Sequence, residues 1–368
     1  MRGLWAVLKK EALQMARDRA TLLFALLVPV FELVLFGLID TTVRDVPTVV
    51  FDQSRTQESR GLLQGLVNTS FFEVVGYAGS RAELHGEIVA GRASVGIEVP
   101  PDFARRRQRG ESADFLVLID GSDNSISSQA MAAASGLALS RSLSELLRAS
   151  GRRELPIDPH PLLLFNPDSR SANLLIPGLI AILLTFSATI LTAFAIVRER
   201  ERGTLEQLMV TPVSPLAVVI GKLLPYLGLG FVTLLLVLLV MVTVFRVPIH
   251  GSSLLLIAVA QVYLLALLSL GLLVSTRAKT QAEAIQGAMA FMLPSVLLSG
   301  YIFPLSSLPG PLRAISQVLP ATHFIAISRG IVLRGATLGD LWPHVAWLLG
   351  LSAVLVLGST RAFKKTLS

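Results

Sequence analysis

The sequence predicts an α-helical polytopic membrane protein with six transmembrane helices and a large extracytoplasmic α/β domain inserted between the first and second spans. Of its 368 residues, 52% are hydrophobic and only 15% are charged, against about 25% charged in an ordinary soluble domain. Long apolar runs fill residues 173–368, which indicates a five-span transmembrane domain. Residues 40–172 instead alternate short polar and apolar runs, as a domain in water does.

The chain opens with a basic segment followed by an apolar one. In residues 1–19, apolar residues recur at helical spacing among five Lys and Arg, which predicts an amphipathic interface helix; a disordered basic leader is the alternative. Residues 20–39 are long enough for a first span and too long for the apolar core of a signal peptide. Glu32 lies within this span, where a carboxylate is costly. It is either a pathway or gating residue or a protonated or paired structural residue near the outer end of the span.

Residues 40–172 predict a small α/β domain, because β-type runs alternate with helical patterns. Ser80 with Glu83 forms a capping box before the second helix. A longer helical pattern near the end of the domain predicts a stalk helix. The expected strands are Val46–Asp52, Phe71–Tyr77, Ala93–Val99 and Asp114–Asp120, and the expected helices are Glu58–Asn68, Arg81–Ala90 and Ser125–Ser150.

Five further apolar runs predict the remaining spans. They are Asn173–Val197, Leu223–Phe245, Ser252–Thr276, Ala284–Leu312 and Leu341–Thr360. Prolines interrupt the fourth of these runs, so we expect a helix to about Gly300 and then an irregular or re-entrant segment. Gln261 is a polar residue within the third run and a second candidate for a pathway or gating role.

The distribution of Lys and Arg predicts the orientation. The loops on one side of the six spans hold 14 basic residues, and the short loops on the other side hold 4. The positive-inside rule places the first set, with both termini, in the cytoplasm and the α/β domain outside the plasma membrane. Because the basic residues flank apolar spans, their net charge does not indicate nucleic-acid binding.

The segment 198–212, RERERGTLEQLMVTP, is a charged insert between two spans. Gly203 permits a turn, and Thr204 with Gln207 predicts a helix cap, so we expect a short amphipathic helix at the cytoplasmic face. Prolines 212 and 215 end this helix. An ordinary solvated loop is the alternative.

This segment resembles the cytoplasmic coupling helix of ABC type-2 permeases, the membrane subunits of bacterial ABC exporters of the multidrug and antibiotic-efflux type. The residues that match the pattern E-x-E-x-G-T-x-E-x-L are Glu199, Glu201, Gly203, Thr204, Glu206 and Leu208. Two shorter stretches also resemble the family: Phe165-Asn166-Pro167 with Ile176-Pro177-Gly178, and Leu319-Pro320-Ala321-Thr322-His323 with Arg329 and Gly335.

The resemblance implies transport driven by a separate cytoplasmic ABC ATPase subunit that binds ATP and Mg²⁺. It assigns ATPase coupling to Arg198, Glu199, Arg200, Glu201, Gly203, Thr204, Glu206 and Gln207. It also implies a dimer with a second permease copy or a paralogue, and a periplasmic adaptor is a further candidate partner. Membrane lipid surrounds the spans.

The sequence itself supports a separate ATPase. A phosphate-binding loop requires G-x-x-x-x-G-K-[ST], but the single Gly-Lys pair, Gly221-Lys222, is followed by Leu223 and has Leu216 at the first Gly position. We find no catalytic constellation and no His spacing typical of a metal site. The function that the resemblance implies is export, and the expected cargo is a small amphipathic or lipid-like molecule. The alternatives are a non-transporting sensor or scaffold with an external ligand-binding domain, and a proton-driven transporter using Glu32.

Overall fold

The computed structural model describes residues 3–39, 43–149, 164–204 and 213–365. The chain divides into two compact units. The membrane unit comprises Met1–Asp40 and Leu163–Ser368, and the α/β unit comprises Thr41–Leu162.

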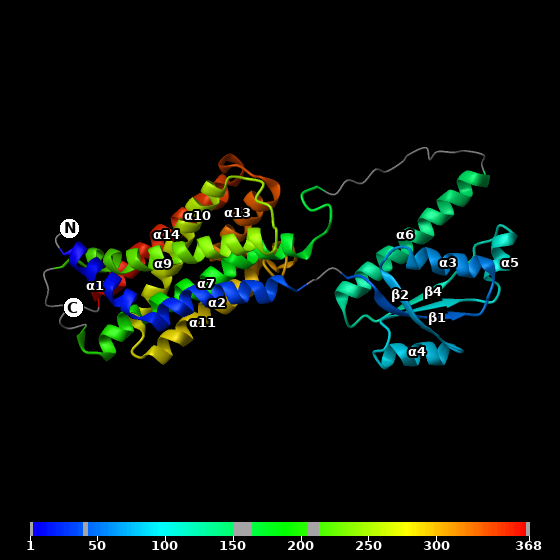
Figure 1. Cartoon of the computed structure of the whole chain (residues 1–368), viewed down its shortest axis with the longest axis horizontal. Helices are drawn as coiled ribbons and strands as arrows, with labels where there is room; N and C mark the ends of the chain where they lie inside the picture. The colour runs from blue at the N-terminus through cyan, green and yellow to red at the C-terminus, as the bar shows by residue number, and fades with distance from the viewer. Residues whose placement is uncertain (1–2, 40–42, 150–163, 205–212, 366–368) are drawn as a thin grey trace. The chain divides into compact units, whose positions relative to one another are not determined.

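The membrane unit is helical, and Figure 1 shows its long helices running side by side. Its helices are α1 (Leu4–Arg17), α2 (Arg19–Gly37), α7 (Ser171–Glu201), α9 (Pro215–Thr243), α10 (Ser253–Arg277), α11 (Gln281–Leu298), α12 (Gly310–Val318), α13 (Pro320–Arg334) and α14 (Leu338–Lys365), with a 3₁₀ turn at Leu305–Ser307. Within the described residues, five helices are long and apolar enough to cross a membrane, namely α2, α7, α9, α10 and α14.

The predicted span Ala284–Leu312 is shorter and more polar in the structure than the other spans. Its helix, α11, has 18 residues, begins with Gln281 and Glu283, and ends at Leu298. Gly300 takes a φ of 84°, and the 3₁₀ turn and α12 follow. The expected change from helix to irregular chain is therefore present at this point.

Side-chain caps explain where several of these helices begin. Asp18, Ser214, Ser252 and Thr280 each accept a hydrogen bond from the backbone N–H three residues ahead. Pro215 occupies the first position of α9, where a proline N–H is not needed. The structure therefore corrects one prediction, because Pro215 starts the next helix and the span begins eight residues before the predicted Leu223.

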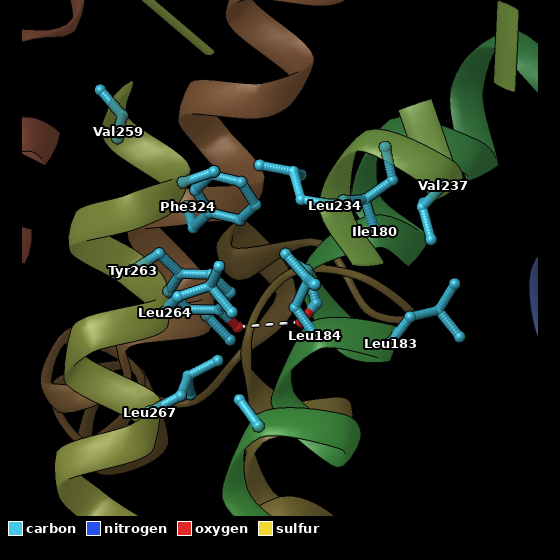
Figure 2. Close-up of a cluster of buried hydrophobic side chains, with 14 of the residues drawn as sticks. Ile180, Leu183, Leu184, Leu234, Val237, Val259, Tyr263, Leu264, Leu267 and Phe324 are labelled. Atoms are coloured by element: carbon cyan, nitrogen blue, oxygen red, sulfur yellow. Dashed lines mark hydrogen bonds between the residues drawn. The ribbon is translucent and has the colours of Figure 1, made fainter. Parts of the chain in front are cut away.

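Tyr263 of α10 lies at the centre of the apolar core of the membrane unit (Figure 2). Its ring stacks on Phe324 of α13, with ring centres 4.4 Å apart. Its hydroxyl group lies 2.6 Å from Thr185 Oγ1 and donates to the carbonyl oxygen of Ala181 at 3.0 Å, both on α7. A buried hydroxyl needs such partners, so this bond fixes how α7, α10 and α13 pack together.

The α/β unit contains a four-stranded sheet in the order β2-β1-β3-β4, in which only β4 runs antiparallel to its neighbour. Its elements are β1 (Val46–Asp52), α3 (Gln57–Val67), β2 (Phe72–Tyr77), α4 (Arg81–Val89), β3 (Val95–Val99), α5 (Phe103–Gln108), β4 (Leu116–Ile119) and α6 (Asn124–Ala149). The strands lie within two residues of their predicted ends, and α5 was not predicted.

Alternate residues of β1 are buried on opposite faces of the sheet. Val46 and Val50 pack with α3 and α6, whereas Val49 packs with Leu84 of α4. Figure 1 shows α4 on one side of the sheet and α3 and α6 on the other. The unit is therefore a three-layer α/β fold.

Two local predictions in and beside the α/β unit are corrected. Ser80 caps α4 as expected, but Glu83 accepts from the N–H of Gly79 and not from that of Ser80. The predicted domain end at residue 172 is also too late. Arg170 Nη2 donates to the carbonyl oxygen of Phe245 at 3.0 Å, which ties this stretch to the membrane unit.

Candidate functional site

The acid–base cluster of the segment 198–212 is helical. Helix α7 continues four residues beyond the predicted span end at Val197, and its last turn consists of Arg198, Glu199, Arg200 and Glu201, which we call the charged end of α7. Arg and Glu are good helix formers, so nothing in this run stops the helix. Successive residues of an α-helix point about 100° apart, and four in a row therefore project around the whole helix.

Glu199 is buried and connects α7 to two other helices. Its Oε1 atom lies 2.6 Å from Lys10 Nζ on α1 and 3.8 Å from Lys222 Nζ on α9. Its Oε2 atom accepts a hydrogen bond from the Thr204 hydroxyl. Burying a carboxylate is costly unless it is paired and hydrogen-bonded, and these partners offset that cost. Glu199 is thus a structural junction and not a surface charge.

Lys222 completes this buried cluster. Its Nζ atom lies 2.5 Å from Glu11 Oε1 on α1 and donates to the carbonyl oxygen of Ala195 on α7 at 3.2 Å. Both charged side chains are at most 5% exposed. The cluster of Lys10, Glu11, Glu199 and Lys222, which we call the ion-pair junction, joins α1, α7 and α9.

Arg198 connects α7 to the junction between α1 and α2. Its Nη1 atom lies 3.1 Å from Asp18 Oδ2, and its guanidinium group lies 5.4 Å from the ring centre of Phe194. Asp18 also accepts from the backbone N–H of Thr21 at 3.0 Å and so begins α2. The same carboxylate therefore fixes the start of α2 and the end of α7.

Arg200 and Glu201 connect α7 to α10 and α11. Arg200 donates to the carbonyl oxygens of Thr276 and Ala278 at the end of α10. Glu201 accepts from the backbone N–H of Gln281, the first residue of α11, at 3.0 Å and from its side-chain amide. The charged end of α7 therefore contacts five other helical elements, α1, α2, α9, α10 and α11.

Gly203 and Thr204 follow the last turn of α7 and end the helix. Gly203 takes a φ of 69°, a conformation that favours glycine and is typical of the residue after a helix. Thr204 bonds back to Glu199, both to its carbonyl oxygen at 3.3 Å and to its carboxylate. The predicted helix, with Glu206 and Gln207, lies outside the described residues, as do all of residues 205–212.

The two pathway candidates lie apart from the charged end of α7. Glu32 is partly buried on α2, and no other described residue forms an ion pair or hydrogen bond with its side chain. The Nε2 atom of Gln261 on α10 is buried and has no hydrogen-bond partner in the described part of the chain. Glu32 and Gln261 Nε2 are thus polar groups within apolar helices, and neither has a hydrogen-bond partner among the described residues.

The other segments that resemble the family meet at the opposite end of α7. Ser328 Oγ on α13 donates to the carbonyl oxygen of Pro177 at 2.8 Å. Arg329 Nη1 donates to the carbonyl oxygen of Gly300, just after α11, at 3.0 Å. These bonds hold the start of α7 and the end of α11 against α13.

Sequence reasoning missed Glu11 and Lys222. The signal was present, because Lys222 is the one charged residue of α9 and a charge in an apolar helix requires a partner. Glu11 lies one turn after the buried Val7 of α1, so it belongs to the buried face of that helix. What the sequence does not show is that these two helices contact each other.

Comparisons with known proteins show the family. The family model described as ABC-2 family transporter protein matches residues 19–361. The chain belongs to the ABC-2 transporter family. It is therefore the membrane subunit of an ABC transporter, and this membership implies a partner ATPase subunit. The match spans both units and includes the charged end of α7.

Relatives of this ABC-2 chain align over most of their length. The probable multidrug ABC transporter permease YbhS of Escherichia coli strain K12 is 31% identical over 96% of this chain and 94% of its own length. The probable multidrug ABC transporter permease YbhR of the same strain is 29% identical over 95% of each chain. The inner membrane transport permease YhhJ is 27% identical over 87% of this chain and 86% of its own.

The pKa of Asp18 predicts an acid-sensitive contact. The hydroxyl and backbone N–H of Thr21, with the positive charge of Arg198, hold the pKa of Asp18 below its usual value of about 3.9. A carboxyl group whose pKa is lowered by folding adds stability above its unfolded pKa and loses it as the pH falls through the folded pKa. We therefore expect Asp18→Asn to lower the melting temperature in detergent at neutral pH, and we expect this difference to shrink below about pH 4.

Asparagine is the matched replacement for Asp18, because it still caps a helix but carries no charge. The measurement is thermal unfolding of both proteins from neutral pH down to about pH 3. A difference in melting temperature that does not change across this range would contradict a contribution from the ionised Asp18.

Proposed function

We propose that the chain is the permease subunit of an ATP-driven exporter with six spans, formed by α2, α7, α9, α10, α11 with the segment that follows it, and α14. The excess of Lys and Arg supports a cytoplasmic location for both termini and for the charged end of α7. The α/β unit is then extracytoplasmic. ATP and Mg²⁺ bind to the separate ATPase subunit, and the permease acts with a second copy or a paralogue.

The bonding of the charged end of α7 carries this proposal. A partner that moves the segment after Gly203 also displaces the last turn of α7. Because each charge in this turn is bonded to a different helix, the displacement reaches α1, α2, α9, α10 and α11 together. Contiguous networks of packed and hydrogen-bonded groups of this kind carry energetic coupling between sites.

The coupling residues then divide into two roles. Glu199 is buried and already bonded, so it transmits force through α1 and α9 and does not touch the ATPase. Glu201 is exposed and reaches α11. Gly203, Thr204, Glu206 and Gln207 belong to the docking segment. Arg198 and Arg200 link that segment to α2 and α10.

The proposed cargo is a small amphipathic or lipid-like molecule that leaves the cytoplasm or the inner leaflet. YbhS and YbhR are described as probable multidrug permeases, which supports a cargo of this kind. Glu32 and Gln261 are the proposed pathway or gating residues, because both are polar groups without a protein partner in the described structure. The α/β unit is available to a periplasmic adaptor.

Glu199→Gln tests the coupling role, because it removes the charge and keeps the shape. In proteoliposomes containing the permease with its ATPase, we expect export of an amphipathic dye per ATP hydrolysed to fall about tenfold, within the usual range of allosteric coupling. The ATPase should still co-purify, since Glu199 is buried. The matched control is Glu283→Gln at the start of α11, an acid outside α7, which should export normally.

Two results would contradict the proposal. Equal losses in Glu199→Gln and Glu283→Gln would show that the charged end of α7 has no special role. Export driven by a pH gradient without ATP or ATPase, and abolished by Glu32→Gln, would instead support a proton-driven transporter. Membership in the ABC-2 family favours the ATP-driven mechanism.

A further inference from the structure

A second charged feature lies where α7, α10 and α14 end, and Arg200 is the one of its cations that the coupling scheme uses. A groove of about 690 Å³ is lined by Arg200, Thr276, Arg277, Lys279, Gly358 and Arg361. We call it the basic groove. It contains four cationic side chains, and no carboxylate lines it in the part of the chain that the structure describes.

Within the described residues, no acid neutralises the four positive charges of the basic groove. There, Arg200 bonds to carbonyl oxygens, which leaves its charge in place. Among the described residues, no acid pairs with Arg277, Lys279 or Arg361. Converging cations repel one another, so this arrangement favours an anion between them.

A neighbouring hollow at the same end of α7 shows the contrast. It has about 500 Å³ and also presents four cations, Lys10, Arg17, Arg198 and Arg202. There Asp18 pairs with Arg198, and Glu199 pairs with Lys10. The positive-inside rule accounts for basic residues at both places. Of these two hollows, the basic groove is the one in which four cations meet without a described acid.

The surface next to the basic groove indicates which anion it takes. Val354 and Leu357 lie seven and four residues before Arg361, so all three share one face of α14. Both apolar side chains are more than half exposed. In a membrane protein such a face contacts acyl chains, and the charged residue at its end lies at headgroup level. A soluble anion or a soluble partner would not need this apolar face next to the groove.

We propose that the basic groove binds the phosphate headgroup of an anionic phospholipid, whose acyl chains lie along the exposed face of α14. Basic pockets between the ends of transmembrane helices suit such headgroups. Gly358 opens the wall of the groove, since a side chain at this position would meet no other atom within 4 Å. The proposal rests on the membrane location of the chain and not on its transport mechanism.

Native mass spectrometry of the full chain in detergent tests the proposal, with titration by phosphatidylglycerol and by phosphatidylcholine of the same acyl chains. The charge variant is the triple Arg277→Gln, Lys279→Gln and Arg361→Gln. Each charge near a lipid surface contributes about fivefold to binding, so we expect the triple variant to bind phosphatidylglycerol about a hundredfold more weakly. Phosphatidylcholine should bind the wild type much more weakly than phosphatidylglycerol.

Two further variants separate a defined groove from diffuse charge. The triple Lys9→Gln, Arg17→Gln and Arg202→Gln removes the same charge outside the basic groove and should bind like the wild type. Gly358→Leu removes no charge but fills the groove, and should weaken phosphatidylglycerol binding about tenfold, as expected when one good contact is lost. Equal losses in the two triple variants, or normal binding by Gly358→Leu, would overturn the proposal.

Two other occupants are distinguished by the same proteins. If inorganic phosphate displaces phosphatidylglycerol at a similar concentration, the groove is a free-phosphate site and the lipid proposal is wrong. The triple variant of Arg277, Lys279 and Arg361 is also tested for co-purification with the ATPase subunit in lipid-free detergent. If it loses the ATPase but still binds added phosphatidylglycerol normally, the groove is a protein-docking surface. The proposal is supported when phosphate fails to compete and the ATPase remains bound.

Discussion

Replacing Lys222 by Met is expected to destabilise the membrane unit by about 3–5 kcal/mol, because it leaves Glu11 buried without its partner. Lys222 Nζ lies 2.5 Å from Glu11 Oε1, and both side chains are almost completely buried. An unpaired buried carboxylate loses its water without gaining a counter-charge. The measurement is the thermal or denaturant unfolding of the purified chain in detergent.

The double variant Glu11→Met with Lys222→Met is the decisive comparison. It removes both charges, so no buried carboxylate is left unpaired, while Glu199 keeps Lys10 at 2.6 Å. Replacing a whole buried ion pair by apolar residues is often neutral or stabilising. We therefore expect the double variant to recover most of the loss. Two variants of equal instability would contradict the proposed pairing.

Lys10→Met supplies a control within the same ion-pair junction. The Lys10 side chain is 43% exposed, so water compensates for part of its charge. Lys222 Nζ also remains 3.8 Å from Glu199 Oε1, so the buried carboxylate keeps a counter-charge, and we expect a smaller loss than in Lys222→Met. The large effect should thus belong to the buried cation and not to every Lys in the cluster.

Gly271→Ala is expected to force α7 and α10 apart. A Cβ atom on Gly271 would overlap the hydroxyl of Thr192 and the backbone carbonyl oxygen of Thr189 on α7. The hydroxyl has another rotamer, but a backbone carbonyl within a helix cannot turn away. Overpacking of this kind costs about 1–3 kcal/mol, and Gly271→Val should cost more. Unfolding in detergent measures both variants.

Gly228→Ala in α9 is the matched control, because a Cβ atom there meets nothing within 4 Å. Alanine is favoured over glycine in a helix by about 1 kcal/mol, so this variant should be neutral or slightly stabilising. If Gly271→Ala behaves like Gly228→Ala, the close approach of α7 and α10 is not a determinant of stability.

Local sequence patterns predicted most of the secondary structure. Alternation in Val46–Asp52 predicted the same strand that the structure contains, and Ser80 begins the predicted helix. Long apolar runs predicted five helices that the structure shows to be long enough to span a membrane. These features depend on neighbouring residues, which is why a single sequence reveals them.

The end of α7 was harder to predict, because its charges were expected to lie after the end of the span, next to a short amphipathic helix that binds a partner. Arg and Glu permit a helix as readily as a loop, and only Gly203 provides a stop. Sequence spacing does not show that Glu199 is buried between Lys10 and Lys222, since 189 residues separate it from Lys10.

By itself, the sequence determined that this chain is a membrane permease subunit with an α/β unit between its first two apolar helices. Hydrophobic runs, charge asymmetry and the RERERGT motif are all local properties of the chain. Only the tertiary structure showed that the four charges of this motif connect α7 to other helices of the membrane unit. Their partners come from helices that are far apart in the sequence. Burial and pairing depend on which helices meet, and no local pattern specifies that.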